Sequence, residues 1–145
     1  MKPSVSFLIL ALLLMLGFAG SCTFETDSSG KLAGMWHLTS VDTVGTGGRN
    51  NMRDSASFWM FENKLLQLSN RTGTITMRFN RSGDSLTVSK PYWYINQGDD
   101  EALEDASGLR PFGINSLQES FKVNTLTGGK MILQSQTLVL HFSKF

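Results

Sequence analysis

Apolar and polar residues alternate along several short segments of the chain. The clearest segment contains Ile75, Met77 and Phe79, whose neighbours are polar. The same pattern recurs at residues 36–41, 85–89, 121–125 and 138–143. Alternation with a period of two predicts strands that turn one face to a core and the other to water.

Turn-forming residues separate these segments, at 45–51, 62–64, 70–73, 81–84 and 127–130. Breaks every ~8–12 residues predict an all-β domain, which we place at residues 32–145. We expect an antiparallel up-and-down β-barrel of about eight strands, because closure leaves no strand edge unpaired. A two-sheet sandwich has the same periodicity and is the alternative.

Two stretches depart from the alternation. Residues 98–108 are acidic, which predicts a solvated loop or a single helical turn within it. Residues 110–117 combine Pro111 and Gly113 with the apolar Phe112 and Ile114. We interpret this second stretch as a short 3₁₀ or helical plug that closes one end of the barrel.

The N-terminus has the features of a secretory signal peptide at residues 1–21. Lys2 precedes an apolar run at 5–18, and small residues follow it. The run is shorter than the ~20 residues that cross a bilayer as a helix, which disfavours a permanent span. Ala19-Gly20-Ser21-Cys22 resembles the bacterial lipobox.

The lipobox resemblance implies that Cys22 is lipidated and becomes the first residue of the mature protein. Residues 22–31 would then be a flexible polar tether, and the protein would be attached to the cell envelope at the outer membrane. The alternative is an ordinary thiol near a cleavage site. Cys22 is the only cysteine, so an internal disulfide is excluded.

Charge and motifs exclude several function classes. The chain has 13 basic and 12 acidic residues without a basic stripe, which argues against a nucleic-acid partner. Its two histidines, His37 and His141, have no patterned Cys or Asp ligands nearby, so we predict no metal site. A Gly-x-Ser-x-Gly nucleophile elbow is also missing. We therefore predict a non-enzymatic protein without a cofactor.

The start of the domain carries a family resemblance. Gly34-Met35-Trp36 matches the Gly-x-Trp pattern of lipocalins and related calycins, and residues 31–38, 112–117 and 138–145 resemble small lipocalin-like lipoproteins of Bacteroidetes. The resemblance implies a lipocalin-like barrel with Trp36 at its closed end. It also implies that Lys144 is the basic residue that packs over this tryptophan.

Two segments, 58–61 and 91–95, are apolar or aromatic on both faces. We predict that Trp59, Tyr92, Trp93 and Tyr94 form an aromatic rim at the barrel mouth, where a small apolar or stacked ligand binds. The side chains on the outer face of these two segments could instead pack under a loop, or form an exposed patch that docks a protein partner.

The sequence thus predicts a lipid-anchored binding module for a small apolar ligand. The alternative is an accessory, inhibitor or other interaction lipoprotein whose barrel is filled by side chains. Large residues expected on the inner face, among them Met77, Phe79, Leu140 and Phe142, favour a filled barrel.

Overall fold

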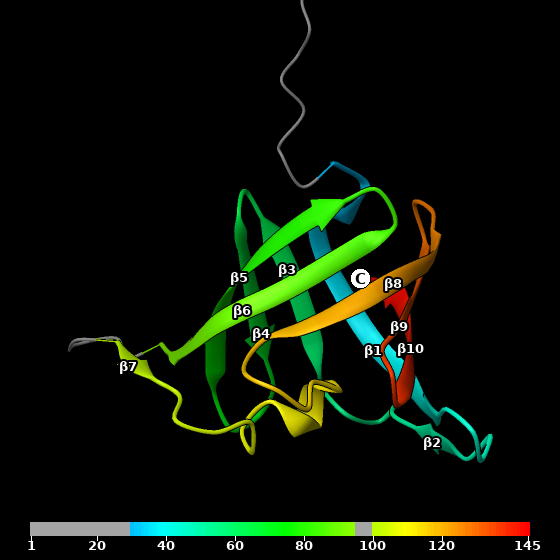
Figure 1. Cartoon of the computed structure of the whole chain (residues 1–145), viewed down its shortest axis with the longest axis horizontal. Coiled ribbons are helices and arrows are strands. Elements are labelled where there is room, and N and C mark those ends of the chain that lie inside the picture. The colour runs from blue at the N-terminus through cyan, green and yellow to red at the C-terminus, as the bar shows by residue number, and fades with distance from the viewer. Residues whose placement is uncertain (1–29, 95–99) are drawn as a thin grey trace, which may run out of the picture.

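A computed structural model describes residues 30–94 and 100–145 (Figure 1). The signal peptide, Cys22 and the predicted tether up to residue 29 lie outside the described residues. The strands are β1 (Gly34–Thr43), β2 (Arg49–Asn51), β3 (Phe58–Glu62), β4 (Leu65–Ser69), β5 (Thr74–Ser82), β6 (Ser85–Trp93), β7 (Glu101–Ala102), β8 (Glu119–Leu126), β9 (Lys130–Gln134) and β10 (Leu138–Lys144). Two 3₁₀ helices accompany them, η2 (Gly30–Leu32) and η3 (Arg110–Phe112).

Eight of the strands form a closed antiparallel barrel in the order β1-β3-β4-β5-β6-β8-β9-β10, and β10 pairs back with β1. The short β2 extends the sheet along the far half of β1, and β7 pairs with the end of β6. Closure through β1 and β10 confirms the predicted barrel and excludes the sandwich.

The predicted alternation holds until β-bulges shift it. In β5, Ile75 and Met77 are buried as expected. A register shift between Leu38 and Ser40 turns Val41, rather than Ser40, toward the core. Another shift between Val123 and Thr125 does the same for Leu126. An inserted residue exchanges the two faces of a strand, and periodicity alone does not locate it.

Two predicted loops and the predicted plug can be compared with the structure. Residues 45–51 are not all loop, because Arg49–Asn51 pair with β1 as β2. The acidic stretch, predicted as a solvated loop with a possible helical turn, contains the short strand β7, and at its end the Leu109 amide donates a 3.0 Å hydrogen bond to the Ala106 carbonyl and closes one turn. Residues 110–112 form the predicted 3₁₀ helix, η3.

Side chains fill the interior of the barrel. Trp59 is fully buried, and its ring lies 5.0 Å from that of Phe142, 5.8 Å from that of Phe121 and 6.1 Å from that of Phe61. Phe61 in turn meets Phe79 edge-on at 5.0 Å. Edge-to-face contacts of this kind are favourable geometries for aromatic rings. They form a continuous aromatic core across the barrel.

At the end where β1 begins, η2 covers the core. Leu32 is buried, and its carbonyl accepts a 2.9 Å hydrogen bond from the Trp36 indole Nε1. The Lys144 ammonium lies 4.5 Å from the centre of the Trp36 ring and donates to the Ala33 carbonyl. Gly34 leaves room for this lysine, because a Cβ there would come within 2.8 Å of Lys144 Nζ.

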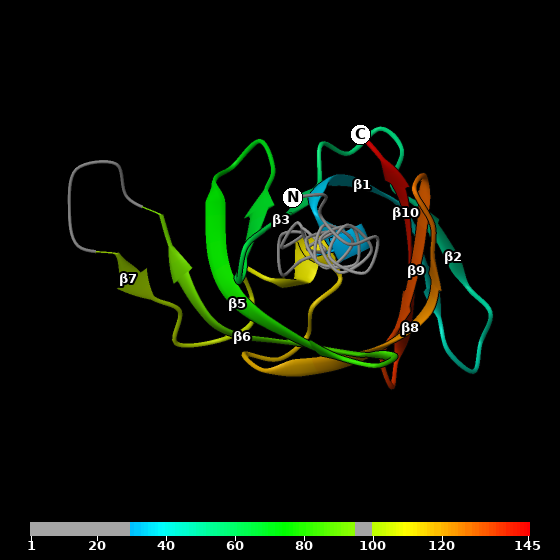
Figure 2. The same ribbon diagram turned by 90° about the horizontal axis from the view of Figure 1, so that it is seen from above.

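The opposite end is closed by η3 and its flanks. Leu109, Phe112 and Ile114 are buried in the core, and η3 lies within the ring of strands seen from above (Figure 2). The Trp59 Nε1 donates a 3.1 Å hydrogen bond to the Phe112 carbonyl. The left-handed Gly113, with φ 82°, ends the helix against Leu140, where no Cβ would fit. The barrel is therefore packed along its axis and covered at both ends.

Lys90 resets the alternation of β6. Leu86 and Val88 face inward, so simple alternation would point Tyr92 inward as well. Lys90 instead has a left-handed backbone, with φ 53°, at the register shift between β5 and β6. Beyond it Pro91 is buried, and Tyr92 is on the outer face. This bulge decides which aromatic residues of β6 reach the surface.

An ion pair lies on the outer face where the barrel closes. Asp42 of β1 accepts a 2.9 Å hydrogen bond from His141 of β10 and a 2.8 Å bond from Arg49 of β2. The bond from the Arg49 guanidinium is the main reason that the pKa of Asp42 is lowered to about 2. Asp42 thus joins both strands that flank β1.

We predict that Lys90→Val lowers the free energy of unfolding by about 1–2 kcal/mol, because a β-branched residue is strongly disfavoured in the left-handed region. Lys90→Gly is the matched control and should retain the stability of the parent, because glycine adopts positive φ without a steric penalty. Urea unfolding measures both. Equal stability of the valine variant would show that the bulge does not hold Lys90 left-handed.

We also predict that acid removes the contribution of Asp42. The pKa of its carboxyl is lower in the folded protein than its ordinary value of 3.8, so the ionised form stabilises the fold above about pH 4 and this contribution disappears as the pH falls toward 2. Urea unfolding of the parent and of Asp42→Asn should differ at neutral pH and converge over that range. A difference that is independent of pH would contradict the assignment.

Candidate functional site

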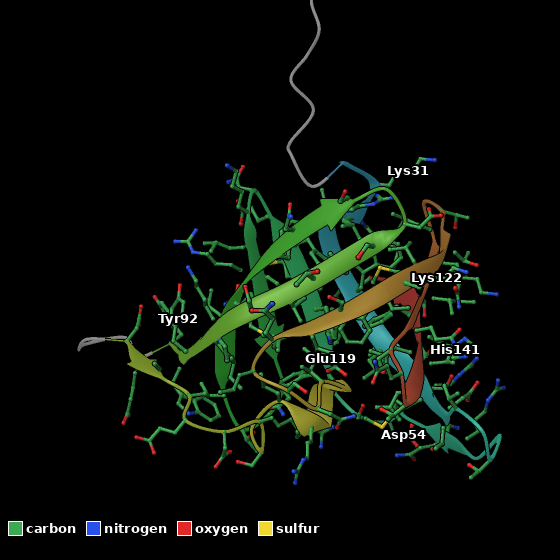
Figure 3. All side chains as sticks on the ribbon, viewed as in Figure 1. Lys31, Asp54, Tyr92, Glu119, Lys122 and His141 are labelled. Atoms are coloured by element: carbon green, nitrogen blue, oxygen red, sulfur yellow. The ribbon has the colours of Figure 1, made fainter. Side chains whose placement is uncertain are left out.

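The structure does not bring the four predicted ligand-binding aromatic residues together. Trp59 is in the barrel core and has no exposed surface. Trp93 lies at the end of β6 and is 37% exposed. Tyr92 and Tyr94 lie on the outer face of the barrel and line one groove; Figure 3 labels Tyr92. The groove with the two tyrosines is our candidate site.

The floor of the groove is a row of side chains across four strands. Met60 of β3 pairs with Gln67 of β4, Gln67 pairs with Thr76 of β5, and Thr76 pairs with Tyr92 of β6. Residues directly opposite each other in an antiparallel sheet place their side chains on the same face. The register of the barrel therefore assembles this row from residues that are far apart in the sequence.

The groove has a volume of about 530 Å³ and is open to solvent. Leu65 and Tyr94 project beside the row and are 38% and 55% exposed. The Tyr94 amide donates a 3.1 Å hydrogen bond to the Thr74 carbonyl. This bond continues the pairing of the chain with β5 beyond the last residue of β6. Polar residues complete the rim, namely Glu62, Asn63 and Asp100.

Tyr92 also borders a second apolar hollow on its other side. This hollow of about 420 Å³ includes Pro91, Leu103 and Leu117. It forms where β6 changes partner, since β8 pairs with β6 up to Val88 and β7 begins to pair at Tyr92. Tyr92 thus lines two neighbouring hollows on the surface.

The chemistry of the groove suits recognition of a molecule with an apolar or planar face. Neither Tyr92, Tyr94 nor Gln67 makes a side-chain hydrogen bond to another described residue. The hydroxyls and the amide can therefore pair with a ligand, while the rings and Met60 supply apolar surface. Burial of apolar area with a few polar contacts is the usual composition of a small-molecule site.

Trp93 belongs to a separate, acidic hollow of about 260 Å³. Its ring covers Gly108, where a Cβ would come within 3.1 Å. Glu104 and Asp105 also line this hollow. The hydroxyl of Ser107 bonds to the Asp105 carboxylate, and this bond lowers the pKa of Asp105. Trp93 therefore packs over the barrel end, beside an Asp105 carboxylate whose ionised form is favoured.

The two histidines are on the outer face and bond to the protein. His37 bonds to the Ser55 carbonyl and stacks on Phe58 at 5.0 Å, and His141 bonds to Asp42. Within residues 30–94 and 100–145, no group of three or more His, Cys, Asp or Glu side chains could hold a metal ion. None of the helices in that same part of the chain is long and apolar enough to span a membrane.

Sequence reasoning missed Met60, Gln67 and Thr76 as members of the site. Gln67 and Thr76 have no aromatic or charged group that would draw attention to them, and Met60 was seen only as part of an apolar segment. Their proximity depends on the register of three strand pairs. A sequence pattern within one strand does not contain this information.

Comparisons with known proteins agree with the fold. The family model described as "Lipocalin-like domain" matches residues 13–145. A crystal structure of a lipocalin-like protein from Bacteroides uniformis is similar with a TM-score of 0.62 and 20% identity, over 80% of this chain and 100% of that one. An uncharacterised protein from Bacteroides eggerthii is similar with a TM-score of 0.51 and 18% identity, over 78% and 98% of the respective chains.

No curated protein matches the chain. At these identities the two solved structures support the fold alone. The family match covers most of the chain and includes the Gly34–Trp36 motif and the strand that carries Lys144. The closed eight-stranded barrel, with Trp36 buried beneath Lys144, agrees with that match. The chain belongs to the lipocalin-like domain family.

Proposed function

We propose that this protein is a lipid-anchored, non-enzymatic binding protein of the bacterial cell envelope. Its binding site is the tyrosine groove, which we define as the surface formed by Met60, Leu65, Gln67, Tyr92 and Tyr94. The ligand is a small molecule with an apolar or planar face. The proposal keeps the ligand class expected from the sequence and moves its site from the barrel mouth to the outer wall.

The observation that carries this proposal is the filled interior. Lipocalin-like barrels often hold small hydrophobic ligands, but here Trp59 occupies the axis together with Phe121 and Phe142. An eight-stranded barrel is just wide enough for side chains to fill it. A ligand inside would have to displace η3, which Trp59 holds through the Phe112 carbonyl. The groove offers apolar surface to a ligand without displacement of η3.

The anchor is supported by the sequence around Cys22. Seven residues separate the end of the lipobox-like Ala19-Gly20-Ser21-Cys22 from Gly30, the first described residue of the domain. Stable attachment to a bilayer needs more than one acyl chain, since a single chain binds reversibly. Bacterial lipoproteins normally carry three, so a lipidated Cys22 would hold the protein firmly on the membrane.

Replacement of the anchor tests the localisation. We expect Cys22→Ala to leave the protein unlipidated and in the soluble fraction of disrupted cells. Ser21→Ala is a suitable control because a small residue remains before the cysteine, and this variant should fractionate with membranes as the parent does. Equal membrane association of the Cys22→Ala variant would contradict the anchor.

Native mass spectrometry tests the groove. We expect protein purified from its own envelope to carry a small molecule, and the double variant Tyr92→Ala/Tyr94→Ala to bind it at least about fivefold more weakly, since each aromatic contact is worth about 0.5–1.5 kcal/mol. Phe145→Ala is the matched control, because this exposed aromatic residue contacts Phe58 and does not line the groove.

Retention of the ligand by the tyrosine double variant would move the binding site elsewhere. If the same ligand is also lost on Trp59→Phe, which removes the bond to Phe112 while keeping an aromatic ring, the site is in the barrel interior. That pair of results would overturn the outer site.

A second candidate function is the docking of an envelope protein on the same wall. The observation that favours it is the openness of the surface around Tyr92, where two shallow apolar hollows adjoin. Such a role predicts an apo mass for the purified protein together with a bound protein partner. Loss of that partner in the tyrosine double variant would assign the wall to docking.

A further inference from the structure

The charges of the described domain are separated between the two ends of the barrel. The end at which the described chain begins comprises η2, the β3–β4, β5–β6 and β8–β9 turns, and the last residues of β10. The register shows that these segments are neighbours, since Gly34 pairs with Phe61, Trp36 with Lys144 and Ser143 with Lys130. We call this surface the anchor-proximal end.

Basic side chains predominate at the anchor-proximal end. Among the residues that the structure describes, two acidic side chains, Glu62 and Asp84, lie there with them. The basic ones are all exposed, and they are Lys31, Lys64, Arg81, Lys122, Lys130 and Lys144. Among the described residues, the ion pairs are confined to Asp42 with Arg49 and His141, so the cations of this end are not neutralised by an ion pair.

The opposite end is acidic. It carries the acidic segment of Asp100, Glu101, Glu104 and Asp105 around β7, together with Asp54 and Glu119. Figure 3 shows this separation for the labelled residues, with Lys31 and Lys122 on the upper part of the domain and Asp54 and Glu119 on the lower part. The basic residues Arg53, Arg71, Lys90 and Arg110 offset only part of this charge. A protein with a net charge of only +1 is thus polarised along the barrel.

We infer that the anchor-proximal end docks on the anionic surface of the bilayer that holds the acyl chains of Cys22, so that the barrel stands with its acidic end away from the membrane. The inference rests on the lipid anchor of the proposed function and adds an orientation to it. It commits to lipid headgroups as the partner, on the ground of charge complementarity and of the length of chain between Cys22 and the domain.

That length is short. The eight residue steps from Cys22 to Gly30 span at most about 28 Å when extended, which is a few Debye lengths at physiological ionic strength. Glu25 and Asp27 lie within this segment and oppose the attraction, yet the six basic side chains outnumber all four acids. Each basic residue near an anionic surface strengthens binding by a factor of about five.

Vesicle binding of the unlipidated chain tests the inference separately from the anchor. The buried core extends from Leu32 to Phe142, so a chain from residue 22 to 145 with Cys22→Ala retains the whole fold. We expect it to sediment with vesicles of equal phosphatidylglycerol and phosphatidylcholine at low ionic strength, and to be released at about 0.5 M salt, where screening is nearly complete. Vesicles of pure phosphatidylcholine should not bind it.

Two charge-matched double variants locate the contact. Lys64→Ala/Lys130→Ala, in two turns of the anchor-proximal end, should weaken binding to the anionic vesicles about 25-fold. Arg53→Ala/Arg71→Ala, at the opposite end, removes the same charge and should leave binding within about twofold of the parent. Thermal unfolding checks that both variants are folded.

If both double variants weakened vesicle binding equally, binding would depend on net charge alone and not on which end of the barrel faces the membrane. That result would overturn the inference. Absence of binding to anionic vesicles at low salt would overturn it as well. Neither result tests the lipid anchor, which is tested separately by the fractionation of the Cys22→Ala variant.

Discussion

The indole of Trp59 fixes both the inside and the outside of this barrel. Its ring contacts Phe61, Phe121 and Phe142, which come from different strands, and its Nε1 holds the carbonyl of Phe112 in η3. A buried N–H without a partner costs free energy, so the hydrogen bond couples the aromatic core to the plug. With the axis occupied and both ends covered, chemistry that needs contact with another molecule is left to the outer wall. The proposed site follows from this constraint.

The sequence predicted the fold well because a closed barrel has a simple rule. One face of each strand is apolar, and the turns carry Gly, Asn, Asp or Ser, so the strand count and the plug at 110–112 followed directly. The rule fails at the bulges after Leu38, at Lys90 and after Val123. Each bulge depends on how two strands fit together, which is a tertiary property. Alternation therefore misassigned the residues just beyond the bulges.

The candidate site was predicted only in part for the same reason. The prediction of Tyr92 and Tyr94 rested on their aromatic side chains, in a segment that is aromatic on both faces. The sequence did not show that Lys90 turns them outward while Trp59 stays inside. It also did not show that Gln67 and Thr76 complete a row with Tyr92. A site built across strands is encoded in their register. The four aromatic residues therefore lie in three different places, with Trp59 in the core, Trp93 at a barrel end, and Tyr92 and Tyr94 in the groove.

The groove and the polarised ends are compatible because the groove floor lies on the barrel wall, and only its rim reaches the two ends, at Glu62 and Asn63 and at Asp100. The groove extends along the wall of β3 to β6, whereas the basic side chains lie around the turns at one end. A barrel that stands on a membrane by its basic end keeps the wall open to solvent, and a barrel that lies on its side would cover a large part of it. Charge repulsion acts in the same direction, since the acidic segment around β7 is kept from an anionic surface. Lys64 lies in the turn between Asn63 and Leu65, at the edge of the groove nearest the basic end. Its ammonium therefore places a positive charge beside the groove, which would favour a ligand that carries an anionic group.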